Sequence, residues 1–232
     1  MKINKLNNHI SSSHPSPCLL SLTPGDTEII RQLTRNSCQF IRKGTEIMTN
    51  KNIFDKAEEY KKKIDELRPF DSGMVAQIRQ YYKIGLTWSS NALEGNSLTE
   101  SETKVLLEEG LTVGGKPIRD YYEATGHAQA YEFMYDMAKD RPVSEEDIKT
   151  LHRLFYTQLD SSQAGIYRKE KVIITGSKYP TTSPDKIENM MKEFTEWLSL
   201  QESKLHPVEF AAAAHKKFVF IHPFIDGNGR VA

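Results

Sequence analysis

Apolar residues recur every three or four positions over most of the chain, which is the spacing of helices with one buried face. In the first such stretch Ile53, Ala57, Tyr60 and Ile64 share a face, and Pro69 ends the helix. Helix-starting residues predict further helices that begin at Asp71 or Ser72, Thr99, Pro117, Ser144, Ser183 and Pro207. The pattern therefore predicts an all-α fold.

Stop signals and apolar spacing define these helices further. Gly95 and Gly110 end the second and third helices, and Thr99 with Glu102 fits a capping box. The fourth helix, which runs to Ala138, is expected to turn inward Tyr121, Ala124, Ala128, Tyr131 and Met134. Core packing is also the expected role of the aromatic residues Tyr81, Tyr82, Tyr121, Tyr122 and Trp197.

One segment departs from the helical pattern. Residues Lys171–Thr175 are rich in β-branched side chains, Gly176-Ser177 fits a turn, and Lys178–Pro180 can form a returning strand. A lone two-stranded hairpin is marginally stable in water, so we expect it to pack on helices. The predicted architecture is a helical bundle with one β-hairpin.

The chain divides into three parts on these patterns. Residues 1–47 are expected to be a flexible or weakly helical extension, 48–115 a set of N-terminal helices, and 116–232 the core. The pattern contains no internal repeat.

Composition excludes several classes of protein. The 232 residues carry 31 basic and 31 acidic side chains, so a generally basic nucleic-acid binder is excluded. No run of 18 apolar residues occurs, and we expect no membrane span. Cys18 and Cys38 fit neither a disulfide framework nor a zinc pattern. We expect a cytoplasmic protein without a nucleic-acid partner.

The last predicted helix leads into a segment with several chemically useful residues, His222-Pro223-Phe224-Ile225-Asp226-Gly227-Asn228-Gly229-Arg230. Proline cannot continue the helix, so the imidazole of His222 lies at a turn and can accept a proton near neutral pH. Two glycines permit a turn whose amides form an anion-binding nest. Asp226 is an oxygen ligand of the kind that Mg²⁺ uses beside phosphates, and Arg230 is a forked phosphate donor. The segment predicts transfer of a phosphoryl or nucleotidyl group to a hydroxyl.

This segment resembles the signature of the Fic family, H-P-F-x-[DE]-G-N-[GK]-R, at every defined position. The resemblance implies transfer of AMP from ATP to a Ser, Thr or Tyr hydroxyl of a target protein. It implies that His222 is the general base, that Asp226 holds Mg²⁺, and that Arg230 binds the β/γ end of ATP. It also implies a phosphate cradle formed by Gly227, Asn228 and Gly229. Gly at 229, rather than Lys, is typical of the AMP-transferring branch.

Two further segments are similar to the family. Ser90-Asn91-Ala92-Leu93-Glu94-Gly95 fits its inhibitory motif, [ST]-x-x-x-E-[GN]. The resemblance implies that Ser90, Glu94 and Gly95 belong to an inhibitory helix whose Glu94 pairs with Arg230 and repels ATP. The predicted hairpin matches the family's flap, which docks the target chain by strand addition through Val172, Ile173, Ile174, Thr175, Gly176, Ser177, Lys178 and Tyr179.

Several alternatives stay open at this point. The chain ends at Ala232, and we expect a core truncated after the signature loop because the family's loop leads into another helix. Glu94 can instead orient water, which would make removal of AMP the main activity. Two hypotheses remain. The chain can transfer another phosphate-bearing group, or it is a truncated, inactive helical protein that only binds partners. A homodimer is a further alternative.

Overall fold

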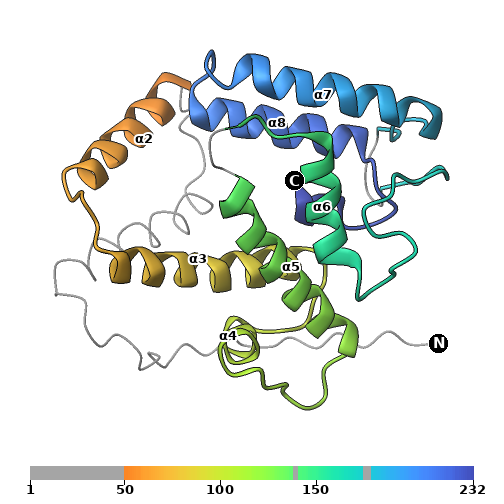
Figure 1. The fold of residues 1–232 in the computed structure, drawn as a ribbon, viewed down its shortest axis with the longest axis horizontal. Helices are drawn as coiled ribbons and strands as arrows, with labels where there is room; N and C mark the ends of the chain where they lie inside the picture. Colours follow the sequence, from red (N-terminus) through yellow and green to blue (C-terminus); the bar gives the residue numbers. More distant parts are fainter. Residues whose placement is uncertain (1–49, 138–140, 175–178) are drawn as a thin grey trace, which may run out of the picture. The chain divides into compact units, whose positions relative to one another are not determined.

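The computed structural model describes residues 50–137, 141–174 and 179–232 (Figure 1). Within this part of the chain the regular structure is helical and no strand is present. The all-α prediction is confirmed. None of the helices described is long and apolar enough to cross a bilayer.

The helices follow one another in the order that the sequence predicts. They are α2 (Asn50–Asp65), α3 (Ser72–Leu93), α4 (Glu100–Glu109), α5 (Ile118–Met137), α6 (Glu145–Tyr156), the 3-10 turn η1 (Pro184–Lys186), α7 (Ile187–Gln201), α8 (Pro207–Ile221) and α9 (Asn228–Val231). Helix α5 packs on α3, α4 and α6, while α7 and α8 lie side by side (Figure 1). The short helix α9 contacts α3, α6 and α8, so the segment after α8 is surrounded by helices from both halves of the described residues.

Side-chain caps set the helix starts where the sequence predicts them. The Asp71 carboxylate accepts a hydrogen bond from the backbone amide of Met74 at 2.9 Å. Thr99 and Glu102 form the reciprocal capping box of α4, which closes at Gly110 with φ 67°. A cap of this kind contributes about 1 kcal/mol to the stability of a helix.

The largest cluster of buried apolar side chains joins α6, α7, α8 and the segment that follows α8. It consists of Ile148, Ile187, Met191, Phe194, Phe218, Ile221 and Phe224. Phe224 has no exposed surface, although its loop also carries the polar residues His222, Asp226 and Asn228. Burial of a side chain this large contributes about 1.5–3 kcal/mol, so Phe224 fixes the loop to the core.

The prediction of which residues of α3 and α5 face inward is partly wrong. Tyr81 and Tyr82 are about half exposed, and Met134 is 41% exposed. The inward face of α3 carries the polar residues Thr87 and Asn91, which are buried. The Thr87 hydroxyl bonds Nδ1 of His127 on α5, and the Asn91 amide nitrogen donates to the Thr87 carbonyl, while the buried Asn91 amide oxygen has no hydrogen-bond partner.

The predicted hairpin is not seen in the residues that the structure describes. Residues Lys171–Ile174 and Tyr179 are not in strands, and Thr175–Lys178 lie outside the described residues. One side chain connects the two sides of this segment, because the Thr181 hydroxyl donates to the Val172 carbonyl at 2.6 Å. A side-chain bond therefore takes the place of a strand ladder at the base of this segment.

Helices α5 and α6 approach closely at Gly126. A methyl group there would clash with the Phe155 carbonyl oxygen and lie 3.1 Å from that of Leu154. Backbone atoms cannot turn aside as a side chain can, so the two helices would have to separate.

We therefore expect Gly126→Ala to lower the free energy of unfolding by about 1–3 kcal/mol in urea denaturation. Gly85→Ala is the matched control, because Gly85 also lies inside a helix and a methyl group there meets nothing within 4 Å. The control should gain about 0.5–1 kcal/mol from helix propensity. Equal effects of the two changes would contradict the close approach of α5 and α6.

Candidate active site

The loop from His222 to Arg230 contains two residues with left-handed backbone conformations. His222 caps α8 in the left-handed region, with φ 52°, and Pro223 then prevents the helix from continuing. Gly227 is also left-handed, with φ 75°, and it precedes α9. The chain thus makes a tight turn that carries His222 and Asp226 on one loop.

The side chain of Asn228 braces this loop from inside. Its amide oxygen accepts from the backbone amide of Phe224, and its amide nitrogen donates to the Phe224 carbonyl, both at 2.9 Å. Asn228 is 2% exposed. Because both polar groups of its side chain are used within the loop, the geometry assigns that side chain to holding the turn.

His152 of α6 supports the loop through a hydrogen bond and a ring contact. Its Nδ1 accepts from the Gly165 amide at 2.8 Å, so its Nε2 carries the proton and donates to the Asp226 carbonyl at 3.1 Å. The ring is fully buried and stacks on Phe224 with 3.8 Å between ring centroids. Burial lowers the pKa of His152 from 6.5 to about 4, which keeps this ring neutral.

Arg168 fixes the backbone around His222. Its amide donates to the Pro223 carbonyl at 2.9 Å and its Nε donates to the His222 carbonyl at 2.8 Å. Its terminal nitrogens donate to the carbonyls of Glu170 and Thr182. One buried guanidinium therefore links the start of the loop to the residues that flank the predicted flap on its two sides.

The imidazole of His222 is half-buried and oriented through one ring nitrogen. Nδ1 lies 3.3 Å from the Val219 carbonyl, a contact in which Nδ1 must be the donor. Burial lowers the pKa of His222 below its usual value. In the resulting neutral ring Nε2 has a lone pair, which is the form that can accept a proton from a hydroxyl.

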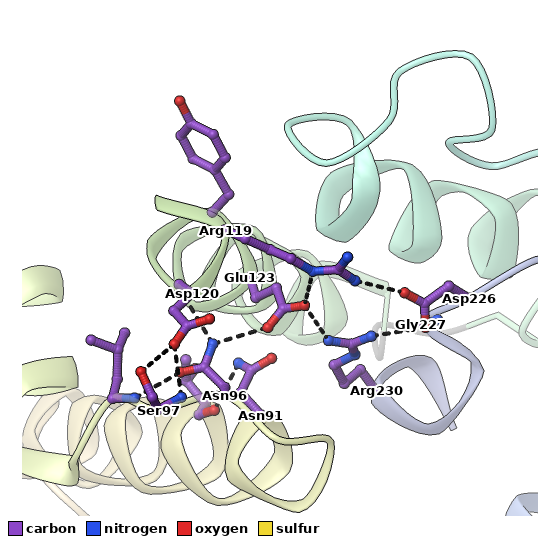
Figure 2. Close-up of polar contacts among 12 residues, drawn as sticks. Asn91, Asn96, Ser97, Arg119, Asp120, Glu123, Asp226, Gly227 and Arg230 are labelled. Carbon is purple, nitrogen blue, oxygen red and sulfur yellow. Dashed lines mark hydrogen bonds and ion pairs between the residues drawn. The ribbon is translucent and has the colours of Figure 1, made fainter. Parts of the chain in front are cut away.

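Two arginines meet on the carboxylate of Asp226 (Figure 2). Arg119 Nη2 donates to Oδ2 at 3.0 Å, and Arg230 Nη2 donates to Oδ1 at 3.1 Å. Glu123 lies behind both cations, because its Oε1 accepts from Arg119 Nε at 3.0 Å and from Arg230 Nη1 at 2.9 Å. Figure 2 shows these four side chains bridging the start of α5 and the loop.

Burial separates the members of this network. The side chains of Arg230 and Glu123 are 3% and 6% exposed, whereas those of Arg119 and Asp226 are 60% and 38% exposed. Glu123 is also held by the Asn96 amide at 3.0 Å. A buried, ordered pair thus supports an exposed pair.

Glu94 caps α3 directly beside the loop. A methyl group at Gly229 would clash with Glu94 Oε1, so the carboxylate lies against the backbone of the loop. Gly95, with φ 94°, turns the chain after this cap, and Ser90 lies one turn earlier on α3. The expected pairing of Glu94 with Arg230 is not the arrangement seen, because the guanidinium of Arg230 is taken up by Glu123 and Asp226.

Three residues of the site were not predicted from the sequence, namely Arg119, Glu123 and His152. Arg119 and Glu123 are four residues apart on α5, so they share a helix face, and this spacing was the available signal. His152 offered none, because a histidine on an apolar helix face is ordinary in sequence.

A divalent cation fits this site as a partner of phosphates and not as a protein-caged ion. No group of three or more His, Cys, Asp or Glu side chains suited to a metal occurs among the described residues. Asp226 offers one partly exposed carboxylate, which suits Mg²⁺ because that ion is often bound by one or two carboxylates and substrate phosphates.

Comparisons with known proteins agree with this geometry. A model of the Fic/DOC family matches residues 142–232. A Fic domain containing signaling protein from Bacteroides thetaiotaomicron superposes with a TM-score of 0.69 at 32% identity, covering 75% of this chain and 68% of that one. The chain therefore belongs to the Fic/DOC family, as its signature indicates.

The chain is also similar in sequence to proteins named as adenylyltransferases. The protein adenylyltransferase Fic of Nematostella vectensis is 33% identical over 186 residues, which are 79% of this chain and 43% of that protein. Its counterpart from Drosophila willistoni is 35% identical over 147 residues, 62% of this chain and 29% of that protein. The chain spans less than half the length of these relatives.

The buried His152 makes the stability of the chain depend on pH. Its folded pKa is about 4 and its ordinary value 6.5, so the unfolded chain binds more protons between these limits. The contribution is complete above pH 6.5 and is lost as the pH falls toward 4.

We expect the free energy of unfolding to fall more steeply over this range in the wild type than in His152→Gln. The difference between the two curves should reach about 3 kcal/mol. Urea denaturation at several pH values measures it, and parallel curves would show that His152 is not held neutral.

Proposed function

We propose that this chain carries the catalytic site of a protein adenylyltransferase, which transfers AMP from ATP to a Ser, Thr or Tyr hydroxyl of a target protein. The observation that supports this most directly is one loop that presents a neutral imidazole, His222, together with the carboxylate of Asp226. The names of the relatives, protein adenylyltransferase Fic, point the same way.

In the proposed reaction His222 Nε2 takes the proton of the target hydroxyl. The hydroxyl oxygen forms a bond to the α-phosphorus of ATP, and the bond from that phosphorus to the bridging oxygen breaks, releasing pyrophosphate. Arg168 positions the base through the His222 carbonyl. A well-placed general base contributes about 10²–10⁴-fold to such a rate.

Phosphate charge is handled by the second half of the loop in this proposal. Asp226 would hold Mg²⁺, which when bound neutralises charge on the α- and β-phosphates. We assign the backbone amides of Asn228 and Gly229 to the phosphates, because the Gly227 amide already donates to Asp226 Oδ1 at 2.6 Å. The side chain of Asn228 keeps this turn in place. Because Arg230 is almost fully buried, we assign it to orienting Asp226 and adding positive potential behind the β/γ end.

Autoinhibition by Glu94 is part of the proposal. Its carboxylate lies against Gly229, where it would repel a triphosphate on the same loop. This mechanism differs from pairing with Arg230. The Glu94 carboxylate would repel the phosphates of a bound nucleotide directly, while Arg230 keeps its ion pair with Glu123. Target docking at Val172–Tyr179 stays a prediction, since Thr175–Lys178 lie outside the described residues.

We predict that Glu94→Gly raises self-labelling from [α-³²P]ATP and Mg²⁺ by about tenfold, which corresponds to ~1.4 kcal/mol of relieved repulsion. The double variant Glu94→Gly/His222→Ala should lose the signal. Filter counting and mass spectrometry of the product identify the group transferred.

Glu66→Gly is the matched control, because Glu66 also follows the last residue of a helix and is exposed. It should leave labelling unchanged. Transfer of a group other than AMP would reject the proposed function, as would equal signals with and without His222. Unchanged labelling in Glu94→Gly would reject only the inhibitory role.

A further inference from the structure

Arg119 lies at the second position of α5, yet it contacts a residue 107 positions further along the chain. Its Nη2 donates to Asp226 Oδ2 at 3.0 Å, and the two side chains are 60% and 38% exposed. Arg230 contacts the other oxygen of the same carboxylate but is only 3% exposed. Of the two cations on Asp226, Arg119 is therefore the one that can reach a ligand in solvent.

The two ends of the Arg119 guanidinium are held very differently. Nε donates to Glu123 Oε1 at 3.0 Å, and this carboxylate is buried and also bonded to Arg230. The guanidinium of an arginine stays charged in proteins, so Arg119 remains a cation in either position. The Nη2 contact with Asp226 is an exposed ion pair, a class with little net stability, so it is easily exchanged.

A divalent cation at Asp226 would remove the attraction that holds Nη2 there. Two cations on one carboxylate oxygen repel each other, whereas a triphosphate bound beside the metal offers new oxygens. The planar guanidinium fork matches phosphate geometry, and Nε can stay on Glu123 while the far end moves.

We propose that Arg119 is a nucleotide-contacting residue with two positions, one on Asp226 and one on the triphosphate. Glu123 acts as its fixed pivot. The structure shows the position on Asp226, and the position on phosphate rests on the proposed function. Arg119 thus competes with the metal for Asp226 and assists the nucleotide.

This dual role predicts effects of opposite sign for Arg119→Gln. Binding of Mn²⁺ alone, followed by electron paramagnetic resonance, should become about fivefold tighter because the competing cation is gone. Binding of a non-hydrolysable ATP analogue at saturating Mg²⁺, followed by calorimetry in the Glu94→Gly background, should become about fivefold weaker. Arg119→Lys should keep part of the nucleotide affinity, since it retains the charge but not the fork.

Arg68→Gln is the control, because Arg68 is a similarly exposed arginine in an ion pair, with Asp65 of α2. It removes the same charge from the chain and should change neither affinity. Tighter Mn²⁺ binding with unchanged nucleotide binding would overturn the proposal by reducing Arg119 to a counter-ion of Asp226. Unchanged Mn²⁺ binding would overturn it as well.

Neither measurement depends on AMP transfer. Opposite shifts in a chain that transfers no AMP would uphold the role of Arg119 and reject the proposed function alone. Normal AMP transfer, with neither the Mn²⁺ affinity nor the nucleotide affinity changed by Arg119→Gln, would uphold the proposed function and reject the role of Arg119.

Discussion

The paired hydrogen bonds between the Asn228 side chain and the backbone of Phe224 are the constraint on which the site depends. They close the turn after α8 from inside, while Phe224 is buried among the side chains of three helices. Stacking on His152 and the bond from His152 to the Asp226 carbonyl fix the same turn from α6. The loop can be polar on its outer side because its inner side is packed like a core.

Burial divides the charged residues by task. Glu123 and Arg230 are buried and partnered, which gives them fixed geometry, since breaking a buried pair leaves an uncompensated charge. Arg119 and Asp226 are exposed on top of them and can exchange partners. The same rigid base therefore supports both a fixed turn and a contact that ligands can replace.

Local rules predict most of this fold, because caps and stops act within a few residues. Asp71, Thr99, Gly110 and Ser144 set helix ends where the sequence indicates. The signature loop was likewise visible, since its residues are contiguous. Long-range features were not: α3 buries polar Thr87 and leaves Tyr81 partly exposed, because the orientation of a helix depends on its neighbours. For the same reason Glu123, and not Glu94, is the partner of Arg230.

The central claim is that this loop holds a nucleoside triphosphate with its α-phosphate beside His222. A crystal structure of the Glu94→Gly chain with Mg²⁺ and a non-hydrolysable ATP analogue tests it most directly. We predict phosphate density against the backbone of Gly227–Gly229, the metal on Asp226, and the α-phosphorus on the Nε2 side of His222. Nucleotide bound away from this loop, or with its base in place of its phosphates at Gly229, would contradict the account.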